Sequence, residues 1–226
     1  MPEVIPAGDA AVLIPFGEEM TLESIALSHS LVRAIEEVHL EGVRALIVGR
    51  SSLMVHYDPL LLTYEEVRGL VEQLVEEGLE VTAPEGRLRE LPTVYGGPFG
   101  RDLAYVAQHH KISEEEVVRL QSGATYVVCS LTFAPGQPLL MGLPRRLVMP
   151  RRPSPEQVPA GSVLVANQTA LYPVANPTGW WQIGRTSTKL FDPWADPPTY
   201  LQPGDRVRFI PVSEEEYLRL GGEGAE

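Results

Sequence analysis

The sequence is poor in several features that common classes of protein require. Cys129 is the only cysteine among 226 residues, which excludes an internal disulfide and a cysteine-based metal site. No apolar run approaches the roughly 18 residues that a membrane helix needs. The first residues also lack the basic stretch and apolar core of a secretory signal. These absences predict a cytoplasmic protein with no membrane segment.

Familiar catalytic motifs are missing as well. The sequence has no G-x-x-x-x-G-K-[ST] phosphate loop, no G-x-G-x-x-G fingerprint, no G-x-S-x-G elbow and no H-E-x-x-H motif. GGPFGRD (96–102) has the composition of a phosphate-binding turn, but its spacing matches no such motif, and a plain helix-entry turn is favoured. We therefore assign no catalytic residue from sequence and expect no metal.

Acidic side chains are scarce in the second half of the chain. The net charge of −12 argues against nucleic acid as the main partner, because phosphate binding needs a basic surface. Residues 1–92 carry 17 acidic and 6 basic side chains, whereas residues 122–212 carry 4 acidic and 8 basic ones. Two solvated helices explain the acidity of the first part but not the missing carboxylates of the second. The second part is expected to attract an anionic small molecule or an acidic protein surface.

The first 85 or so residues alternate strand and helix patterns. The patterns in order are a strand (10–16), a helix (21–40), a hairpin around GRSS (43–58), a helix (63–79) and a last strand in LEVTAP (79–84). Thr63 and Glu66 form a capping box at the start of the second helix. This order is that of a ferredoxin-like unit, and APEGRLRE (83–90) has the composition of a linker. We predict a first domain over residues 1–88.

Residues 89–226 have a different sequence pattern and form the predicted second domain. SEEE (113–116) predicts a capping box that opens one short helix, and from Ala124 onward short β runs are separated by proline and glycine. PAGSV (159–163) and PGDRV (203–207) each place a tight turn before a strand. Many short strands separated by such turns predict a closed β-barrel or a sandwich. The loops at the mouth of a barrel would be available for a site.

The stretch NQTALYPVANPTGWWQIGRT (167–186) is neutral and aromatic except for one charged residue near its end, Arg185. Neutral hydrogen-bond donors and acceptors come from Gln168, Thr169 and Tyr172. Trp180 and Trp181 offer apolar walls, and Arg185 supplies one fixed positive charge. A pocket for a small polar ligand with one anionic group needs these parts and few carboxylates. Packing in a barrel wall is the alternative explanation for the tryptophans.

Two further segments leave alternatives open. The four arginines of PRRLVMPRR (144–152) suit bidentate binding of carboxylates or phosphates, or equally a loop kept soluble by charge. FAPGQPLLMGLP (133–144) is apolar and uncharged, and its three prolines argue against a central strand. Because monomeric proteins rarely expose such patches, this loop is expected to fold into the barrel mouth or to be covered by another chain.

Several of these segments together resemble a known family. The segments occur in the order YGGPFGRDL (95–103), FAPGQPLLMGLP (133–144), PRRPSPEQVPAGSV (150–163), QTALYP (168–173), GWWQIGRT (179–186), KLFDP (189–193) and PGDRVRFIPV (203–212). They resemble the family of the 5-oxoprolinase B subunit, also known as KipI or allophanate hydrolase subunit 1, over essentially the whole chain. The resemblance implies an α+β protein with a ferredoxin-like N-terminal domain followed by a cyclophilin-like β-barrel.

The resemblance also implies a function. It implies one component of an ATP-dependent 5-oxoprolinase, which converts 5-oxo-L-proline to L-glutamate. The partners would be a larger, KipA-like protein (the C subunit of that enzyme) and possibly its A subunit. ATP would be shared with the partner, and the chain alone would be inactive. The alternatives that the family implies are a KipI-like inhibitor of a sensor histidine kinase and a carboxyltransferase-type component of a urea carboxylase or allophanate hydrolase system.

Specific residues follow from the same resemblance. The residues expected to contact the small anionic substrate are Arg185, Gln168, Thr169, Tyr172 and Thr186. For the apolar loop, the resemblance favours cover by the partner, with an interface made of Phe133, Leu139, Leu140 and Met141. On this interpretation, Leu140→Asp should split the complex and leave the lone chain folded.

Overall fold

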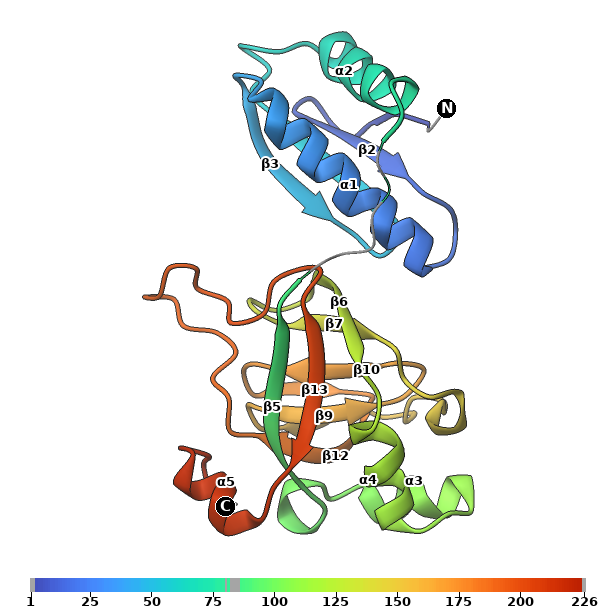
Figure 1. Cartoon of the computed structure of the whole chain (residues 1–226), viewed down its shortest axis with the longest axis vertical. Helices are drawn as coiled ribbons and strands as arrows, with labels where there is room; N and C mark the ends of the chain where they lie inside the picture. Colours follow the sequence, from blue (N-terminus) through green and yellow to red (C-terminus); the bar gives the residue numbers. More distant parts are fainter. Residues whose placement is uncertain (1–2, 80, 82–85, 225–226) are drawn as a thin grey trace. The chain divides into compact units, whose positions relative to one another are not determined.

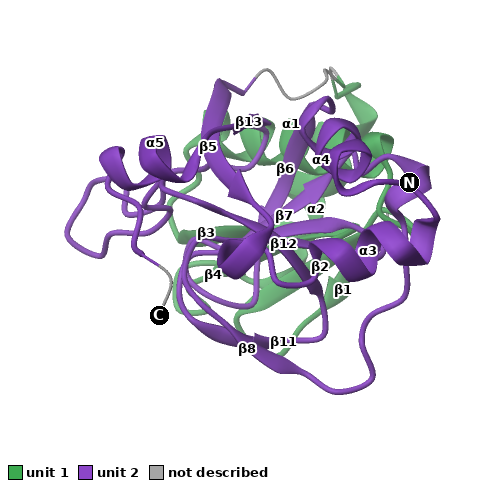
Figure 2. Cartoon of the chain, turned by 90° about the horizontal axis from the view of Figure 1, so that it is seen from below, with its two compact units in different colours: residues 1–85 green, residues 86–226 purple. Residues whose placement is uncertain are grey.

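The computed structural model describes residues 3–79, 81 and 86–224. The chain divides into two compact units, Met1–Glu85 and Gly86–Glu226, which are coloured separately in Figure 2. Among the described residues, no helix combines the length and apolarity that crossing a bilayer requires.

The first unit consists of two helices and an antiparallel sheet (Figure 1). Its elements are β1 (Ile5–Pro6), β2 (Ala11–Pro15), α1 (Leu22–Val38), β3 (Val43–Val48), β4 (Ser52–Tyr57) and α2 (Tyr64–Glu76). The strands lie in the order β1-β2-β4-β3, and every pair is antiparallel. The predicted strand, helix, hairpin and second helix are confirmed. The last predicted strand falls on LEVTAP, of which residues 80 and 82–84 lie outside the described residues.

Local capping explains where the two helices of this unit begin. The Thr21 side chain accepts a hydrogen bond from the Ser24 N–H at 3.0 Å. At α2 the predicted capping box is confirmed, because Thr63 Oγ1 accepts from the Glu66 N–H at 3.3 Å and the Glu66 carboxylate accepts from the Thr63 N–H at 2.8 Å. Each cap satisfies N–H groups that the first helical turn leaves without a partner.

The second unit is built around a closed barrel. Its elements are β5 (Leu88–Tyr95), α3 (Leu103–His110), α4 (Glu114–Ser122), β6 (Tyr126–Leu131), β7 (Pro138–Met141), β8 (Glu156–Val158), β9 (Ser162–Val165), β10 (Thr169–Tyr172), β11 (Asn176–Thr178), β12 (Trp181–Thr186), β13 (Arg206–Pro211) and α5 (Glu214–Arg219). The barrel order is β10-β7-β6-β13-β5-β12-β9. Strands β5 and β13, side by side in Figure 1, pair in parallel, whereas the other barrel pairs formed by the described residues are antiparallel. Of the two predicted architectures, the barrel is confirmed.

The barrel core is apolar and includes several large side chains with no exposed surface. Tyr126 from β6 and Phe209 from β13 meet edge to face, with ring centroids 5.3 Å apart.

The short helix α4 is capped by Ser113, whose Oγ accepts from the Glu116 N–H at 3.2 Å. Only this half of the capping box predicted at SEEE forms, because the Glu116 carboxylate instead pairs with Arg119 at 2.6 Å.

The structure corrects the interpretation of the apolar loop 133–144. Its PLLM segment is strand β7, which pairs with β6 on one side and β10 on the other. Pro138 is compatible with this place because it is the first residue of the strand, where a missing N–H is tolerated. Leu140 has no exposed surface and packs in the barrel core, so it is not an interface residue of this chain. Leu139 and Met141 are partly buried, and Phe133, before the strand, is 79% exposed.

Candidate functional site

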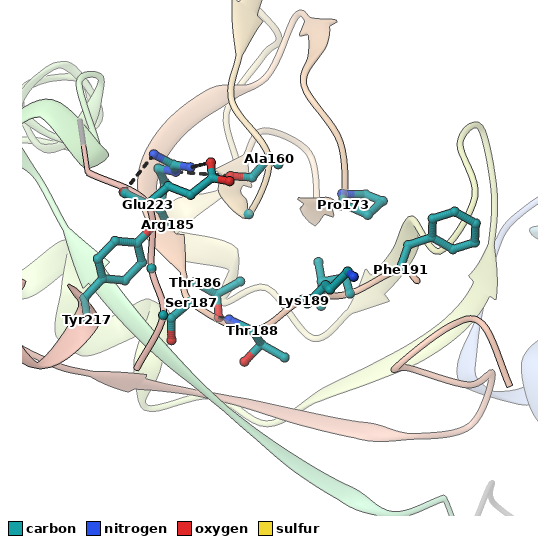
Figure 3. Close-up of a pocket in the computed structure, with 14 residues that line it drawn as sticks. Ala160, Pro173, Arg185, Thr186, Ser187, Thr188, Lys189, Phe191, Tyr217 and Glu223 are labelled. Atoms are coloured by element: carbon teal, nitrogen blue, oxygen red, sulfur yellow. Dashed lines mark hydrogen bonds and ion pairs between the residues drawn. The ribbon is translucent and has the colours of Figure 1, made fainter. Parts of the chain in front are cut away.

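A cavity of about 310 Å³ lies beside the barrel wall in the second unit (Figure 3). Four parts of the chain form it: the turn before β9, the residue after β10, the end of β12 with the loop that follows, and α5 with the segment after it. Its lining residues are Ala160, Gly161, Pro173, Arg185, Thr186, Ser187, Thr188, Lys189, Leu190, Phe191, Tyr217, Gly221, Gly222 and Glu223.

The predicted turn PAG fixes one wall of this cavity. Gly161 has φ +78°, and a Cβ at this position would lie 2.6 Å from the Thr186 carbonyl oxygen. Only glycine is compatible with this approach. Its N–H donates to the Tyr172 carbonyl at 2.7 Å, and its own carbonyl accepts from the Thr186 N–H at 2.9 Å. The turn is thereby held between β10 and β12, and the Ala160 carbonyl is placed next to the side chain of Arg185.

Arg185 is the buried cation of the cavity, since its side chain is only 6% exposed. Its Nε donates to the Ala160 carbonyl at 3.1 Å. Its two terminal nitrogens donate to Glu223, Nη1 to the carbonyl at 3.4 Å and Nη2 to the carboxylate at 3.3 Å. Figure 3 shows the guanidinium directed at both partners. A buried cation needs a nearby anion or acceptor, and here a carboxylate supplies it.

Apart from Lys189, the other walls are neutral or aromatic. Ser187 and Thr188 are partly buried, and the Thr188 N–H donates to Thr186 Oγ1 at 3.2 Å. Lys189 is a second cation in the lining, paired with Asp192 at 2.7 Å and largely exposed. The Tyr217 ring is buried, and this burial raises the pKa of its phenol against the opposing effect of the Arg185 charge. The cavity therefore offers hydroxyl groups, one buried and one exposed cation, and an apolar wall.

Two of the five predicted substrate-contacting residues, Arg185 and Thr186, line the cavity together. The other three do not belong to its lining. Thr169 is buried and its hydroxyl donates to the Leu164 carbonyl at 3.1 Å. Tyr172 is also buried, and its hydroxyl donates to Thr178 Oγ1 at 3.1 Å. Gln168 is partly buried in the turn before β10.

Sequence reasoning missed three lining residues that matter for the chemistry of the cavity, namely Lys189, Tyr217 and Glu223. Lys189 belongs to the KLFDP segment, so the sequence contained a signal for it. Tyr217 and Glu223 reach the cavity only because α5 and the segment after it return to the end of β12. No local pattern encodes that return.

The tryptophans and two of the arginines have packing roles. Trp181 stacks on Tyr105 with ring centroids 4.3 Å apart, and the Arg152 guanidinium lies 4.5 Å from the Trp181 ring centroid. Arg152 is buried and pairs with Asp102 at 2.5 Å. Trp180 belongs to a small buried cluster and has Arg151 5.1 Å from its ring centroid. Both tryptophans thus pack against other side chains, as the alternative explanation expects, and Trp181 belongs to the barrel strand β12.

The two remaining arginines of PRRLVMPRR, Arg145 and Arg146, are exposed on a short 3-10 turn, as expected for a solvated loop.

The segment GGPFGRD also has a structural role, because a Cβ on Gly100 would lie 2.0 Å from the Ile183 carbonyl oxygen of β12. This turn therefore packs its backbone directly on the barrel before α3 begins, which agrees with the helix-entry interpretation.

Comparisons with known proteins converge on one group. The family model for the carboxyltransferase domain, subdomain C and D, matches residues 2–201. The 5-oxoprolinase B subunit of Bacillus subtilis is 39% identical, over 93% of this chain and 92% of its own length. The protein of the same name from Escherichia coli O157:H7 is 42% identical, over 92% of this chain and 94% of its own length.

Solved structures add similarity of fold. The crystal structure of the protein TTHA0988 matches with a TM-score of 0.79 and 31% identity, over 90% of this chain. The present chain spans only 40% of that protein's length. The urea amidolyase of K. lactis matches with a TM-score of 0.72 over 100% of this chain and 16% of its own. Its identity is 19%, so this likeness shows the fold alone.

Proposed function

The chain belongs to the carboxyltransferase domain, subdomain C and D, family, and on this basis we propose that it is the B-type component of an ATP-dependent 5-oxoprolinase. The observation that carries the proposal is similarity over nearly the full length of two relatives with that name. The proposed reaction opens the ring of 5-oxo-L-proline to give L-glutamate.

The cavity at Arg185 is the proposed place for the substrate carboxylate. 5-Oxoproline is small, carries one carboxylate, and otherwise presents a ring with one amide. A fixed guanidinium matches the carboxylate, and the hydroxyls of Thr186, Ser187 and Thr188 match the amide. A volume of about 310 Å³ is at the small end of ligand sites, as a ligand of this size requires. We propose Gln168, Thr169 and Tyr172 as supports of this wall through β10.

Nucleotide chemistry is the part for which a partner is proposed. Opening a lactam with water is unfavourable, and activation of its carbonyl by phosphorylation creates negative charge that needs compensation. The sequence has no phosphate loop, so we propose that ATP is shared with a larger, KipA-like C subunit, that the A subunit is also required, and that the chain alone is inactive. TTHA0988 supports a partner, because this chain spans only 40% of that protein, and the rest of that protein has no counterpart here.

Two exposed aromatic residues mark the proposed partner surface. Phe133 is 79% exposed and has φ +64°, a backbone conformation that costs energy for a side chain of this size. Trp194 is 93% exposed on the loop that begins at the cavity wall. The two loops adjoin, because the Cβ position of Gly136 lies 2.9 Å from Phe191 Cβ. Exposed aromatic side chains are typical anchors of protein interfaces.

The finer fold assignment is also proposed. A ferredoxin-like first domain over residues 1–88 is supported by the antiparallel order β2-β4-β3 with two helices. The closed barrel supports a cyclophilin-like second domain over residues 89–226. We also propose a cytoplasmic location, as the sequence analysis expects.

A carboxyltransferase-type role in a urea carboxylase or allophanate hydrolase system is the second candidate. The carboxyltransferase family to which the chain belongs favours it. The two candidates differ in substrate, because the cavity would take 5-oxoproline in the first case and urea in the second. Inhibition of a sensor histidine kinase is a third prediction from the family resemblance.

Reconstitution tests the proposal. The purified chain is mixed with the KipA-like C subunit and the A subunit of the same source, and the formation of L-glutamate and ADP from 5-oxo-L-proline and ATP is measured. We expect no turnover by the chain alone and stoichiometric glutamate and ADP with all three proteins. Turnover by the chain alone would overturn the proposed dependence on partners. If the full complex does not turn over 5-oxoproline but consumes ATP in the presence of urea once bicarbonate and a biotin-carrying carboxylase are supplied, the second candidate holds instead.

The surface is tested in the same system. Phe133→Ser and Trp194→Ser are expected to weaken co-elution with the KipA-like protein in size-exclusion chromatography while the thermal unfolding of the lone chain stays unchanged. The control is Leu60→Ser, since Leu60 is 91% exposed in the first unit. Equal loss of binding in the control would show that the aromatic residues are not the anchors.

A further inference from the structure

We infer that Glu223 is an internal substitute for the substrate: its carboxylate occupies Arg185 in the free protein, and the carboxylate of the incoming ligand displaces it. The inference rests on the proposed anion site and adds to it a competing group from the same chain. The resulting cavity selects for ligands that carry a carboxylate.

The two sides of the Arg185–Glu223 contact are held very differently. The Arg185 side chain is 6% exposed and the Glu223 side chain is 81% exposed. The guanidinium is positioned independently by the Ala160 carbonyl at 3.1 Å, within the usual range for an N–H···O bond. Its bonds to Glu223, at 3.3 and 3.4 Å, lie beyond that range. The cation is therefore fixed, whereas its anion is held loosely from the solvent side.

The backbone before Glu223 explains how this residue reaches the cavity. Gly221 has φ +87°, which favours glycine, and the Gly222 N–H donates to the Tyr217 carbonyl at 2.9 Å. A Cβ on Gly222 would lie 2.4 Å from the Tyr217 ring, so the backbone of this segment packs directly against the ring. The chain thus turns back over Tyr217 and forms one wall of the cavity with Gly221, Gly222 and Glu223 (Figure 3).

Exchange of one carboxylate for another has a low cost. Removal of the Glu223 carboxylate without replacement would leave the buried cation with only the carbonyl groups of Ala160 and Glu223 as partners, which is unfavourable. A ligand carboxylate restores the charge pair, and the released Glu223 regains full hydration, which it has nearly kept in the free state. Because the Glu223 side chain of this ion pair is 81% exposed and its bond to Arg185 is 3.3 Å long, the competition should reduce ligand affinity by a small factor.

The test is the affinity of the full-length chain for 5-oxo-L-proline, measured by titration calorimetry at low ionic strength. Glu223→Gln keeps the size of the side chain and removes its charge. We expect this variant to bind about 2- to 5-fold more tightly, as the weakness of an ion pair with a largely exposed carboxylate implies. The matched control is Glu215→Gln, which changes an exposed carboxylate of α5 outside the cavity and should leave the affinity unchanged.

A third variant separates this inference from the proposed function. Arg185→Gln should weaken binding at least about tenfold, the scale of one lost charged hydrogen bond. If Arg185→Gln weakens binding but Glu223→Gln is unchanged or weaker, Glu223 does not compete, and the anion site itself stands. If 5-oxoproline binds none of the proteins, or Arg185→Gln binds like the wild type, the anion site and its internal competitor are both overturned.

Discussion

Replacement of Arg185 by alanine should remove the anion contact of the cavity and weaken the turn that frames it. The side chain is 6% exposed and donates to the Ala160 carbonyl at 3.1 Å. Its loss leaves that carbonyl without this donor, which costs about 1–3 kcal/mol of stability. We therefore expect a lower midpoint of thermal unfolding in addition to any effect on activity.

The effect on activity follows from the same guanidinium. A hydrogen bond between charged groups contributes about 1.5–3 kcal/mol, which corresponds to about a 10- to 150-fold loss, at tenfold per 1.4 kcal/mol. Arg185→Lys keeps the charge but not the planar fork, so we expect an intermediate loss. The loss should appear in kcat/KM for 5-oxo-L-proline in the three-protein complex.

The assay compares these variants with Arg146→Ala, which changes an exposed arginine of the 3-10 turn Arg145–Leu147. Activities are measured well below each variant's unfolding temperature, so that the loss of stability does not enter. Arg146→Ala should leave kcat/KM within about twofold, the usual scale of a surface change. Equal losses in Arg185→Ala and Arg146→Ala would place the substrate anion elsewhere and refute the assignment of this cavity.

Three further predictions concern the barrel. Leu140→Asp buries a charge in the core and should prevent folding, whereas Phe133→Asp should leave the circular dichroism spectrum and the unfolding midpoint unchanged. Asp102→Ala removes one anion from the buried Arg152 and should lower the free energy of unfolding in urea by about 3 kcal/mol. Burial raises the pKa of the Cys129 thiol from its ordinary 9.0 to about 12, so native protein should not react with a thiol reagent at pH 8. Because the unfolded thiol ionises first, the free energy of unfolding should also fall as the pH rises above 9.

Helix starts in the first unit could be predicted because their causes are local. Thr63 and Glu66 lie three residues apart and satisfy each other's backbone N–H groups, so the signal and the structure occupy the same short segment. The family resemblance, which rests on several ordered segments, is likewise confirmed by the matching family model and relatives.

The error at strand β7 has a physical reason. A proline blocks a strand only where its missing N–H is needed in the ladder, and Pro138 stands at the first position. An uncharged apolar segment has the same composition whether it faces a partner or the core of its own barrel. The alternation of buried Leu140 with partly buried Leu139 and Met141 becomes visible only when β6 and β10 are in place.

The charge asymmetry of the chain predicted that its second half attracts an anionic small molecule or an acidic protein surface, and in the structure the buried Arg185 of that half has a carboxylate partner. Three of the four acidic residues between 122 and 212 already have basic partners: Glu156 pairs with Arg152, Asp192 with Lys189 and Asp205 with Arg89. Within the described part of the chain, the carboxylate that pairs with Arg185 belongs instead to Glu223, beyond that range. A carboxylate fixed in the barrel wall would pair permanently with Arg185 and close the site to anions. A carboxylate on a segment outside the barrel compensates the cation in the free protein. On the proposed function it also leaves the cation available, so the shortage of acidic residues in the wall fits the proposed anion site.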